Sequence, residues 1–298
     1  MEVRVRVPAT SANLGAGVDC LGLAVRLYLD LDIRASAKNA FAFGKGFDAP
    51  IPDKDNLVLT SMRFLAGRAG KELPPLEIRM DSAIPLSRGL GSSSSAIIAG
   101  LKGADAVLGT GFSDDAVLRM AVEIEGHPDN VAPALLGGFT MAMYDNGSLI
   151  ARKYSAPKVR CVFAVPDYRL STSLARSALP GEIPLTAAVG QLQRAVLLGG
   201  ALAVGDLGHL RELTRDELFT PARAPLMPGC REAMRAAADA GALCAFVSGA
   251  GPTLLALARE NEEAIGEQMK EALTAAGVSS RILCLDPDDT GACVRTEA

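Results

Sequence analysis

The residues best suited to chemistry form a glycine- and serine-rich stretch at residues 85–96, Pro-Leu-Ser-Arg-Gly-Leu-Gly-Ser-Ser-Ser-Ser-Ala. Gly89 and Gly91 precede four serines, and apolar residues then recur at helical spacing over residues 97–108, so the serines stand at a helix N-terminus. Such an end presents unpaired N–H groups and a partial positive charge, and glycine lets the backbone approach an anion closely. The stretch therefore predicts a phosphate-binding loop. The alternative is a Gly/Ser-rich loop that only caps an ordinary helix.

Three well-known site motifs do not fit this stretch. A P-loop needs Gly-x-x-x-x-Gly-Lys-Ser/Thr, and the chain contains neither Gly-Lys-Ser nor Gly-Lys-Thr. A dinucleotide fingerprint needs a third glycine where Ser94 stands. A nucleophile elbow needs Gly-x-Ser-x-Gly, which is absent. We therefore expect a different kind of phosphate loop.

Composition limits the classes of function. The 298 residues, 49% hydrophobic and 21% charged, are typical of a soluble globular protein with one large or two ordinary domains. A net charge of −4, no Trp and 4% aromatic residues argue against nucleic-acid binding. The six cysteines include no Cys-x-x-Cys pair, which favours reduced thiols in a cytoplasm over disulfides or a zinc site.

No stretch of the chain reads as a membrane segment or a signal peptide. The first residues alternate like a strand and lack an apolar signal core. The uncharged run at residues 241–258 is interrupted by Ser248, Gly249, Gly251 and Pro252, which would break a spanning helix. That run predicts two buried strands around a tight turn.

Strand and helix patterns alternate without strict βαβ repetition, which predicts a mixed α+β class. Strands are expected over residues 3–7, 21–33, 76–80, 159–165 and 281–285. Helices are expected over residues 57–68, 97–108, 114–125, 186–204, 207–217, 230–240 and 262–275. Loops are expected at residues 39–53 and 171–176, and a Gly-Gly bend followed by strand-like residues at 131–143. The weakest joint lies near residues 146–158, without a true linker composition.

Three glycine-containing stretches together resemble the GHMP small-molecule kinases, named for galactokinase, homoserine kinase, mevalonate kinase and phosphomevalonate kinase. Residues 85–96 match the family's ATP-phosphate loop, and Ser-Gly-Ala-Gly-Pro-Thr at residues 248–253 matches its C-terminal glycine motif. Pro-Ala-Thr-Ser-Ala-Asn-Leu-Gly-Ala-Gly-Val-Asp at residues 8–19 resembles the homoserine kinase branch. Residues 125–131, 172–180 and 221–223 also resemble that branch, so the resemblance covers nearly the whole chain.

The resemblance implies a two-domain α+β GHMP kinase fold. Its N-terminal, ATP-binding part would be ribosomal protein S5 domain 2-like (residues 1–152), and its C-terminal part a ferredoxin-like α/β sandwich (residues 153–298). It implies transfer of the γ-phosphoryl group of ATP to the side-chain hydroxyl of L-homoserine, on the path to threonine. Composition and the interrupted apolar run predict no nucleic-acid or membrane partner, and the resemblance allows a homodimer, for which the sequence shows no interface signature. The rivals are a GHMP kinase for another alcohol, a non-catalytic ligand sensor of the same fold and, remotely, a serine hydrolase.

The resemblance also assigns a nucleotide site with Mg²⁺. The residues expected to bind ATP are Pro85, Leu86, Ser87, Arg88, Gly89, Leu90, Gly91, Ser92, Ser93, Ser94, Ser95, Gly249 and Gly251. Mg²⁺ prefers oxygen ligands, which Ser93 and Glu125 would supply. Glu123 on the same helix is the alternative metal ligand, and Glu125 is preferred because it adjoins the His-Pro-Asp-Asn turn.

Homoserine is a zwitterion, so its site needs both charges. By resemblance its amine faces Asp19 and Asp129, with Asn13 and His127 beside the amino acid, while Arg176 and Arg223 hold its carboxylate. Taken alone, either arginine also fits a surface residue. The catalytic set is Asp129, Asn130 and Glu125. Asp129 is a candidate base, and proton transfer directly to the phosphate is the alternative.

Overall fold

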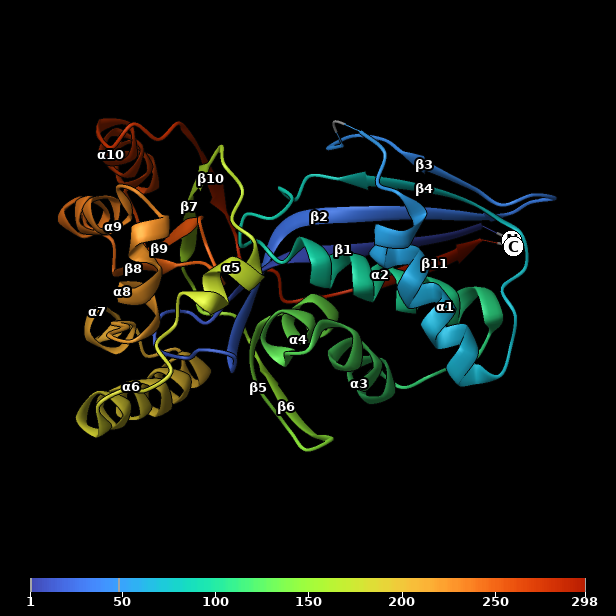
Figure 1. The fold of residues 1–298 in the computed structure, drawn as a ribbon, viewed down its shortest axis with the longest axis horizontal. Helices are drawn as coiled ribbons and strands as arrows, with labels where there is room; N and C mark the ends of the chain where they lie inside the picture. The colour runs from blue at the N-terminus through green and yellow to red at the C-terminus, as the bar shows by residue number, and fades with distance from the viewer. Residues whose placement is uncertain (1, 48, 298) are drawn as a thin grey trace.

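Two β-sheets organise residues 2–47 and 49–297, which are the residues described by the computed structural model (Figure 1). The first sheet contains β1 (Glu2–Ala12), β2 (Leu21–Ala35), β3 (Ala40–Phe43), β4 (Leu76–Ser82), β5 (Phe139–Asp145), β6 (Ser148–Tyr154) and β11 (Cys293–Glu297). The second contains β7 (Arg160–Pro166), β8 (Cys244–Val247), β9 (Leu254–Ala258) and β10 (Ser280–Leu285). Helices cover these sheets, which confirms the α+β prediction.

The first sheet runs in the order β11-β1-β2-β4-β3, and β2 also pairs with β5, which pairs with β6. All of these pairings are antiparallel except β3 with β4. β2 is long enough to pair with β4 over its second half and with β5 near its start. A register shift between Pro8 and Ala9 marks the point where β1 turns toward the functional loops.

Four helices that lie between β3 and β5 in the sequence pack beneath the first sheet in the view of Figure 1. They are α1 (Leu57–Ala69), α2 (Ser92–Leu108), α3 (Asp114–Glu125) and α4 (Pro128–Leu136). Asn56 caps α1, since its Oδ1 accepts hydrogen bonds from the backbone N–H groups of Val58 and Leu59. The central helix α2 places its N-terminal end beside the end of β1, because Thr10 N donates to Leu90 O (3.1 Å).

The second sheet has the order β10-β7-β9-β8 and is entirely antiparallel. Its connecting helices are α5 (Thr172–Ser177), α6 (Leu185–Val204), α7 (Leu210–Leu213), α8 (Phe219–Arg223), α9 (Cys230–Asp239) and α10 (Glu262–Ala275). The short 3₁₀ segments are η1 (Asp53–Asp55) and η2 (Ala224–Leu226). In Figure 1, α9 and α10 lie on the outer side of this sheet. Among the described helices, only α6 is long and apolar enough to cross a membrane, judged by length and composition alone.

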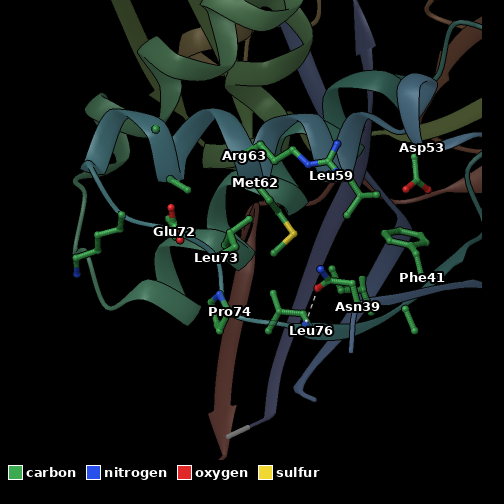
Figure 2. A pocket seen from close by; sticks show the side chains of 15 residues that line it. Asn39, Phe41, Asp53, Leu59, Met62, Arg63, Glu72, Leu73, Pro74 and Leu76 are labelled. Carbon is green, nitrogen blue, oxygen red and sulfur yellow. Dashed lines mark hydrogen bonds between the residues drawn. The ribbon is translucent and has the colours of Figure 1, made fainter. Parts of the chain in front are cut away.

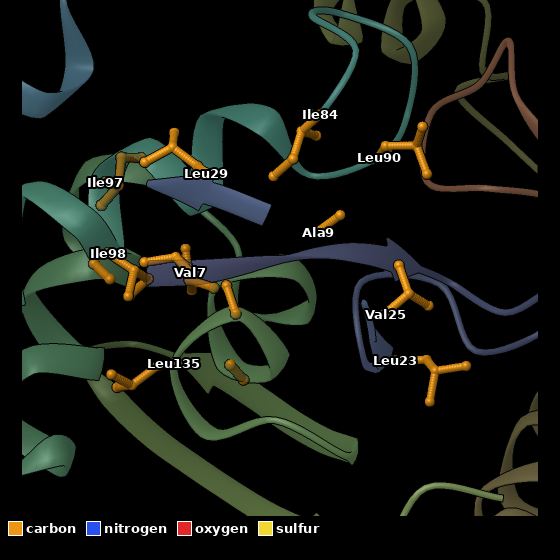
Figure 3. Close-up of a cluster of buried hydrophobic side chains, with 14 of the residues drawn as sticks. Val7, Ala9, Leu23, Val25, Leu29, Ile84, Leu90, Ile97, Ile98 and Leu135 are labelled. Carbon is orange, nitrogen blue, oxygen red and sulfur yellow. The ribbon is translucent and has the colours of Figure 1, made fainter. Parts of the chain in front are cut away.

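The core joins the two sheets. Cys161, Phe163 and Val165 of β7 belong to the same buried cluster as the first sheet and α2, whereas Val162 and Ala164 face a second cluster with α9 and α10. Both faces of β7 are therefore buried, which explains its unbroken apolar run. Figure 3 shows part of the first cluster, with side chains from β1, β2, α2 and α4 and with Ile84 and Leu90 from the segment before α2.

Most predicted elements are confirmed, including the two strands within residues 241–258, which are β8 and β9. The loop expected at residues 171–176 is wrong, because Ser171 Oγ caps a helix there by accepting from Leu174 N. The loop expected at 39–53 contains β3. The helix expected over 207–217 is only α7, since the Asp216 carboxylate accepts three backbone N–H bonds and starts a new turn into α8.

Two further differences concern elements that the sequence did not predict. Residues 128–136 form α4, although Pro133 lies inside it and the sequence indicated a bend and strand-like residues from 131. β6 and β11 were not predicted. β6 contains the expected domain boundary at 152/153, and that boundary stays a prediction.

Candidate functional site

The glycine–serine loop is anchored in the core by one side chain. Leu90 is 1% exposed, and it lies between Gly89 (φ 77°) and Gly91 (φ 70°), both in the left-handed region. A Cβ on Gly91 would lie 1.9 Å from Thr10 Oγ1, and one on Gly89 would lie 2.3 Å from Ser248 O. The protein's own packing thus requires these glycines. The loop leads directly into α2 at Ser92.

The C-terminal glycine motif braces this loop from the second sheet. Ser248 Oγ donates to Gly89 O (2.6 Å), and Thr253 N donates to Arg88 O (3.4 Å). Arg88 in turn donates to the carbonyls of Pro166 (2.8 Å) and Asp167 (2.5 Å) at the end of β7. Two sequence motifs about 160 residues apart therefore form one rigid structure at the junction of the sheets.

A cavity of about 250 Å³ opens where the loop, the residue 8–19 segment and helices α3, α4, α5 and α8 meet. Most of the predicted site residues line it: Asn13, Asp19, Ser87, Arg88, Gly89, Gly91, Ser92, Ser93, Glu125, His127, Asp129, Asn130, Arg176, Arg223, Gly249 and Gly251. Pro85, Leu86, Leu90, Ser94 and Ser95 do not line it. Ser95 Oγ donates instead to Pro8 O (2.8 Å), which ties the helix to β1.

Glu125 and the serines of α2 meet at one end of the cavity. Ser93 Oγ and Ser94 Oγ both donate to Glu125 Oε1, at 2.6 and 2.9 Å. Glu123 points elsewhere and pairs with Arg68. The structure therefore places Glu125, and not Glu123, beside the phosphate loop. A carboxylate and hydroxyl oxygens in one place are suitable ligands for Mg²⁺.

Acidic groups and an imidazole also gather in the lining of the cavity. His127 Nδ1 lies 2.5 Å from Asp129 Oδ1, and Asp19, His127 and Asp129 bring their ligand atoms within 4.8 Å of one another. Burial alone would lower the pKa of His127, but the hydrogen bond to Asp129 and the charges of Asp129, Glu125 and Asp19 outweigh it and raise that pKa. The cluster of Asp19, His127 and Asp129 therefore favours a cation.

Two arginines adjoin this acidic cluster. Arg176 Nη2 donates to Asp19 Oδ1 (2.9 Å) in an ion pair whose side chains are 47% and 49% exposed, so the pair contributes little to stability. Arg223 is different, because it is 6% exposed and burial lowers its pKa. Among the described residues no carboxylate lies within 4 Å of the Arg223 guanidinium, which donates only to the carbonyls of Ala175 (3.3 Å) and Gly249 (3.4 Å). A buried guanidinium without a carboxylate is a strong site for an anion.

Two asparagines are held firmly at the cavity wall. Asn13 Nδ2 donates to Gly249 O (2.8 Å), and Asn13 Oδ1 accepts from Asp19 N (2.9 Å). These bonds tie the residue 8–19 segment to the C-terminal glycine motif. Thr10 Oγ1 donates to Asn130 Oδ1 (2.8 Å). That bond leaves Nδ2 as the donor that Asn130 can offer a ligand.

Several lining residues were not predicted as site residues. Leu170, Ser171, Thr172 and Ala250 also line the cavity. Thr172 is the first residue of the motif at residues 172–180. That motif could have pointed to Thr172 and to Ser171 before it. Thr10 was quoted within the N-terminal motif but received no role, because nothing in the sequence shows that it lies beside Asn130.

A larger cavity, of about 670 Å³, lies between α1 and the β3–β4 pair (Figure 2). Leu59, Met62 and Leu76 give it apolar walls, and Asp53 and Arg63 add charge. None of the predicted site residues lines it. Size alone therefore does not identify the reactive site, whereas the converging charges of the smaller cavity do.

Comparison with known proteins identifies the family of the chain. The model of the GHMP kinase N-terminal domain matches residues 56–138, and that of the GHMP kinase C-terminal domain matches residues 198–276. A homoserine kinase from Thermus thermophilus is 48% identical over 263 residues, 88% of each chain. One from Desulfitobacterium hafniense is 43% identical over 295 residues, covering 98% of this chain and 99% of that protein. The crystal structure of homoserine kinase from Cytophaga hutchinsonii has a TM-score of 0.89 and 30% identity, covering 99% of this chain and 97% of that one.

Proposed function

Because this chain belongs to the homoserine kinases of the GHMP kinase family, we propose that it transfers the γ-phosphoryl group of ATP to the side-chain hydroxyl of L-homoserine. The product would be O-phospho-L-homoserine, an intermediate of threonine biosynthesis. We place the reaction in the cytoplasm, in keeping with the six free cysteines.

The observation that carries the proposal for this acceptor is the environment of Arg223. A buried guanidinium that lacks a carboxylate among the described residues is costly unless a ligand supplies one. The carboxylate of an amino acid matches the planar guanidinium fork. A neutral sugar hydroxyl would leave the guanidinium without a carboxylate in direct contact, with only the more distant charges of Asp216, Asp19 and Asp129 nearby, so the geometry favours an amino-acid acceptor.

The ion pair between Asp19 and Arg176 suits a zwitterion in the same way. Both side chains are about half exposed, so separating them costs on the order of 1 kcal/mol or less. The ammonium of homoserine would bind Asp19 and Asp129, and its carboxylate would bind Arg176 and Arg223. Homoserine binding would thus replace the pair between Asp19 and Arg176 by two pairs, one at the ammonium and one at the carboxylate. Holding both charged groups would orient the side-chain hydroxyl toward the phosphate loop.

The phosphate loop suits the triphosphate of ATP. The N–H groups of Gly89, Gly91, Ser92 and Ser93, which line the cavity at the start of α2, would hold the phosphates. The oxygens of Ser93 and Glu125 would hold Mg²⁺, which when bound neutralises phosphate charge. Since phosphoryl transfer requires mainly positioning and charge stabilisation, Asn130 contributes by donating a hydrogen bond beside the loop.

The proton of the acceptor hydroxyl has two routes. Asp129, with its carboxylate bound to His127, would act as the base, or the proton would pass directly to the phosphate. Asp129→Asn distinguishes the two. We expect turnover to fall by a factor of roughly 10² or more if Asp129 is the base. Weaker homoserine binding with unchanged turnover would reject that role.

The acceptor is tested by measuring ADP release with homoserine, mevalonate, galactose and threonine as acceptors. We expect kcat/KM to be highest for L-homoserine. Mevalonate turnover without homoserine turnover would contradict the roles of Arg176 and Arg223. A protein that binds ATP and homoserine but releases no ADP would be a sensor of the same fold.

A further inference from the structure

The two charged groups of an amino acid sit on the same carbon, so the side chains that bind them must lie at a fixed distance from each other. Asp19, assigned to the ammonium, lies between β1 and β2, whereas Arg223, assigned to the carboxylate, is the last residue of α8. The two residues are therefore far apart in the chain. Contacts that join their segments bear directly on which acceptors bind.

Gln191 of α6 joins the two segments. It is 7% exposed, and its Nε2 donates both to Ala16 O (3.1 Å) in the residue 8–19 segment and to Asp216 Oδ1 (3.2 Å). Its Oε1 accepts from Glu217 N (3.4 Å). Both ends of the Gln191 amide are therefore in use, although this side chain does not line the cavity.

Close packing at Gly15 holds the same segment from the other direction. Gly15 has φ 83°, and a Cβ there would lie 2.0 Å from the carbonyl oxygen of Thr214, the buried residue directly after α7. The helices α6, α7 and α8 lie together on the left of Figure 1. The residue 8–19 segment has no room to move toward Thr214, and the hydrogen bond from Gln191 opposes movement away.

Asp216 holds the start of α8, the helix that ends at Arg223. Its Oδ1 accepts from the backbone N–H groups of Leu218 and Phe219, both at 3.0 Å. Its Oδ2 accepts from Thr220 N (2.6 Å) and Thr220 Oγ1 (2.7 Å). These bonds satisfy the N–H groups that a helix leaves unpaired at its start. Arg223 Cζ lies 5.8 Å from the centre of the Phe219 ring, so the fixed turn also supports the guanidinium.

Gly249 completes the connection on the opposite side. Its carbonyl accepts from Asn13 Nδ2 (2.8 Å) and from Arg223 Nη1 (3.4 Å), and Asn13 Oδ1 accepts from Asp19 N. A closed series of contacts results, which we call the acceptor ring. Its members are Asn13, Gly249, Arg223 with the rest of α8, Asp216, Gln191 and Ala16.

We propose that Gln191 and Asp216 are positioning residues of the acceptor site, which set the distance between Asp19 and Arg223 through the acceptor ring. Their roles rest on the proposed function, because that function assigns Asp19 and Arg223 to the two charged groups of homoserine. A ligand with both groups gains from both side chains only when their spacing is correct. A ligand with one charged group needs only one of them, so its affinity does not depend on the spacing.

The test compares L-homoserine with 4-hydroxybutyrate, which has the same hydroxyl and carboxylate but no amine. The dissociation constants of both are measured on the full chain by titration calorimetry, with 4-hydroxybutyrate as a competitor if it binds weakly. Gln191→Met keeps the length of the side chain and removes its amide. We expect this variant to bind homoserine more weakly by roughly tenfold or more, the effect of misplaced binding groups, and to bind 4-hydroxybutyrate as the wild type does.

Gln193→Met is the matched control, because it makes the same change at an exposed position of α6. It should leave both dissociation constants unchanged. Partial unfolding of Gln191→Met would lower the number of binding sites for both ligands but would not change the ratio of their dissociation constants. That ratio therefore measures positioning. A Gln191→Met variant with the wild-type ratio would overturn the proposal.

A second variant separates hydrogen bonding from charge. Burial lowers the pKa of Arg223, and the charge of Asp216 is the largest of those that oppose this shift. Asp216→Asn removes the charge but keeps Oδ1 for Gln191 and for the start of α8, where Asn is as good a cap as Asp. We expect this variant to retain the wild-type ratio of dissociation constants.

Two other results would contradict different parts of the account. If Asp216→Asn loses the ratio as Gln191→Met does, charge and not the acceptor ring determines the affinity, and the positioning roles are wrong. If the wild type itself binds homoserine no more tightly than 4-hydroxybutyrate, the acceptor site of the proposed function is wrong.

Discussion

At the scale of single residues, Arg223 offers the sharpest test of the acceptor site. Arg223→Gln should raise KM for homoserine by about 30-fold or more, because losing one partner of a buried charge pair costs about 2–5 kcal/mol. KM for ATP should change much less, because the Arg223 guanidinium is assigned to the homoserine carboxylate and meets the glycine motif only through one bond to Gly249 O (3.4 Å). Arg215→Gln is the control, because that side chain is 67% exposed. Equal effects on KM for ATP and for homoserine would contradict the assignment.

Thr10 should act through Asn130. Thr10→Val keeps the shape but removes the hydroxyl that donates to Asn130 Oδ1, which lets the amide rotate away from its productive orientation. We expect kcat to fall by about tenfold, the effect of losing roughly 1.4 kcal/mol, with KM for homoserine nearly unchanged. Thr10→Ser retains the hydroxyl and should restore kcat. A Thr10→Ser variant as slow as Thr10→Val would mean that the methyl group, and not the hydrogen bond, is what matters.

Residue types and motifs predicted most of the cavity lining, because phosphate loops and zwitterion sites need glycines, acids and arginines at particular places. They could not show which of two acids faces the cavity. Glu123 and Glu125 are the same residue type on one helix and differ in which way their side chains point. Glu123 pairs with Arg68 of α1, whereas Glu125 accepts from Ser93 at the cavity, and the sequence does not contain that information. The contacts of Thr10 also join residues far apart in the chain, so no local pattern contains them.

At the scale of elements, the junction of β1, the phosphate loop and α2 depends on Gly91. Gly91→Ala forces a left-handed residue to carry a Cβ, which costs about 1–2 kcal/mol, and that Cβ would overlap Thr10 Oγ1. Gly109→Ala is the matched control, since Gly109 has φ 58° and open space. We expect urea unfolding to show a larger loss for Gly91→Ala, by about 1–3 kcal/mol, together with a raised KM for ATP.

Equal losses of stability in these two variants would mean that backbone strain alone accounts for Gly91. The sequence predicted a glycine-dependent loop at this place. It assigned the glycines to ligand approach, and the structure adds a second reason for glycine at these positions, which is close packing against Thr10 and Ser248.

Long, regular patterns predicted the elements well, and local contacts decided the exceptions. β7 was predicted because its apolar run is unbroken, and α10 because its apolar residues recur at helical spacing over its whole length. α4 was missed because Pro133 interrupts the pattern, and α5 because six residues are too few to show a period. β11 was missed because its strand pairing with β1 joins the two ends of the chain.

At the scale of the whole molecule, the shared core predicts cooperative unfolding. Phe163 of β7 and Leu255 of β9 belong to the same buried cluster as Leu23 of β2, and β11 returns from the second sheet to pair with β1. Calorimetry should therefore show a single transition for the full chain, although the sequence suggested two domains. Two resolved transitions would contradict the coupling of the sheets. The chain has no Trp, so heat capacity is a better probe than fluorescence.

The central claim is that the two ends of one cavity hold a phosphoryl donor and an amino-acid acceptor. The most direct measurement is ³¹P NMR of the wild-type protein incubated with ATP, Mg²⁺ and L-homoserine. We predict that a phosphomonoester resonance of O-phospho-L-homoserine appears together with an equal amount of ADP, and that both are greatly reduced with Arg223→Gln. ADP formed without that phosphomonoester, or no loss of ATP at all, would contradict the account.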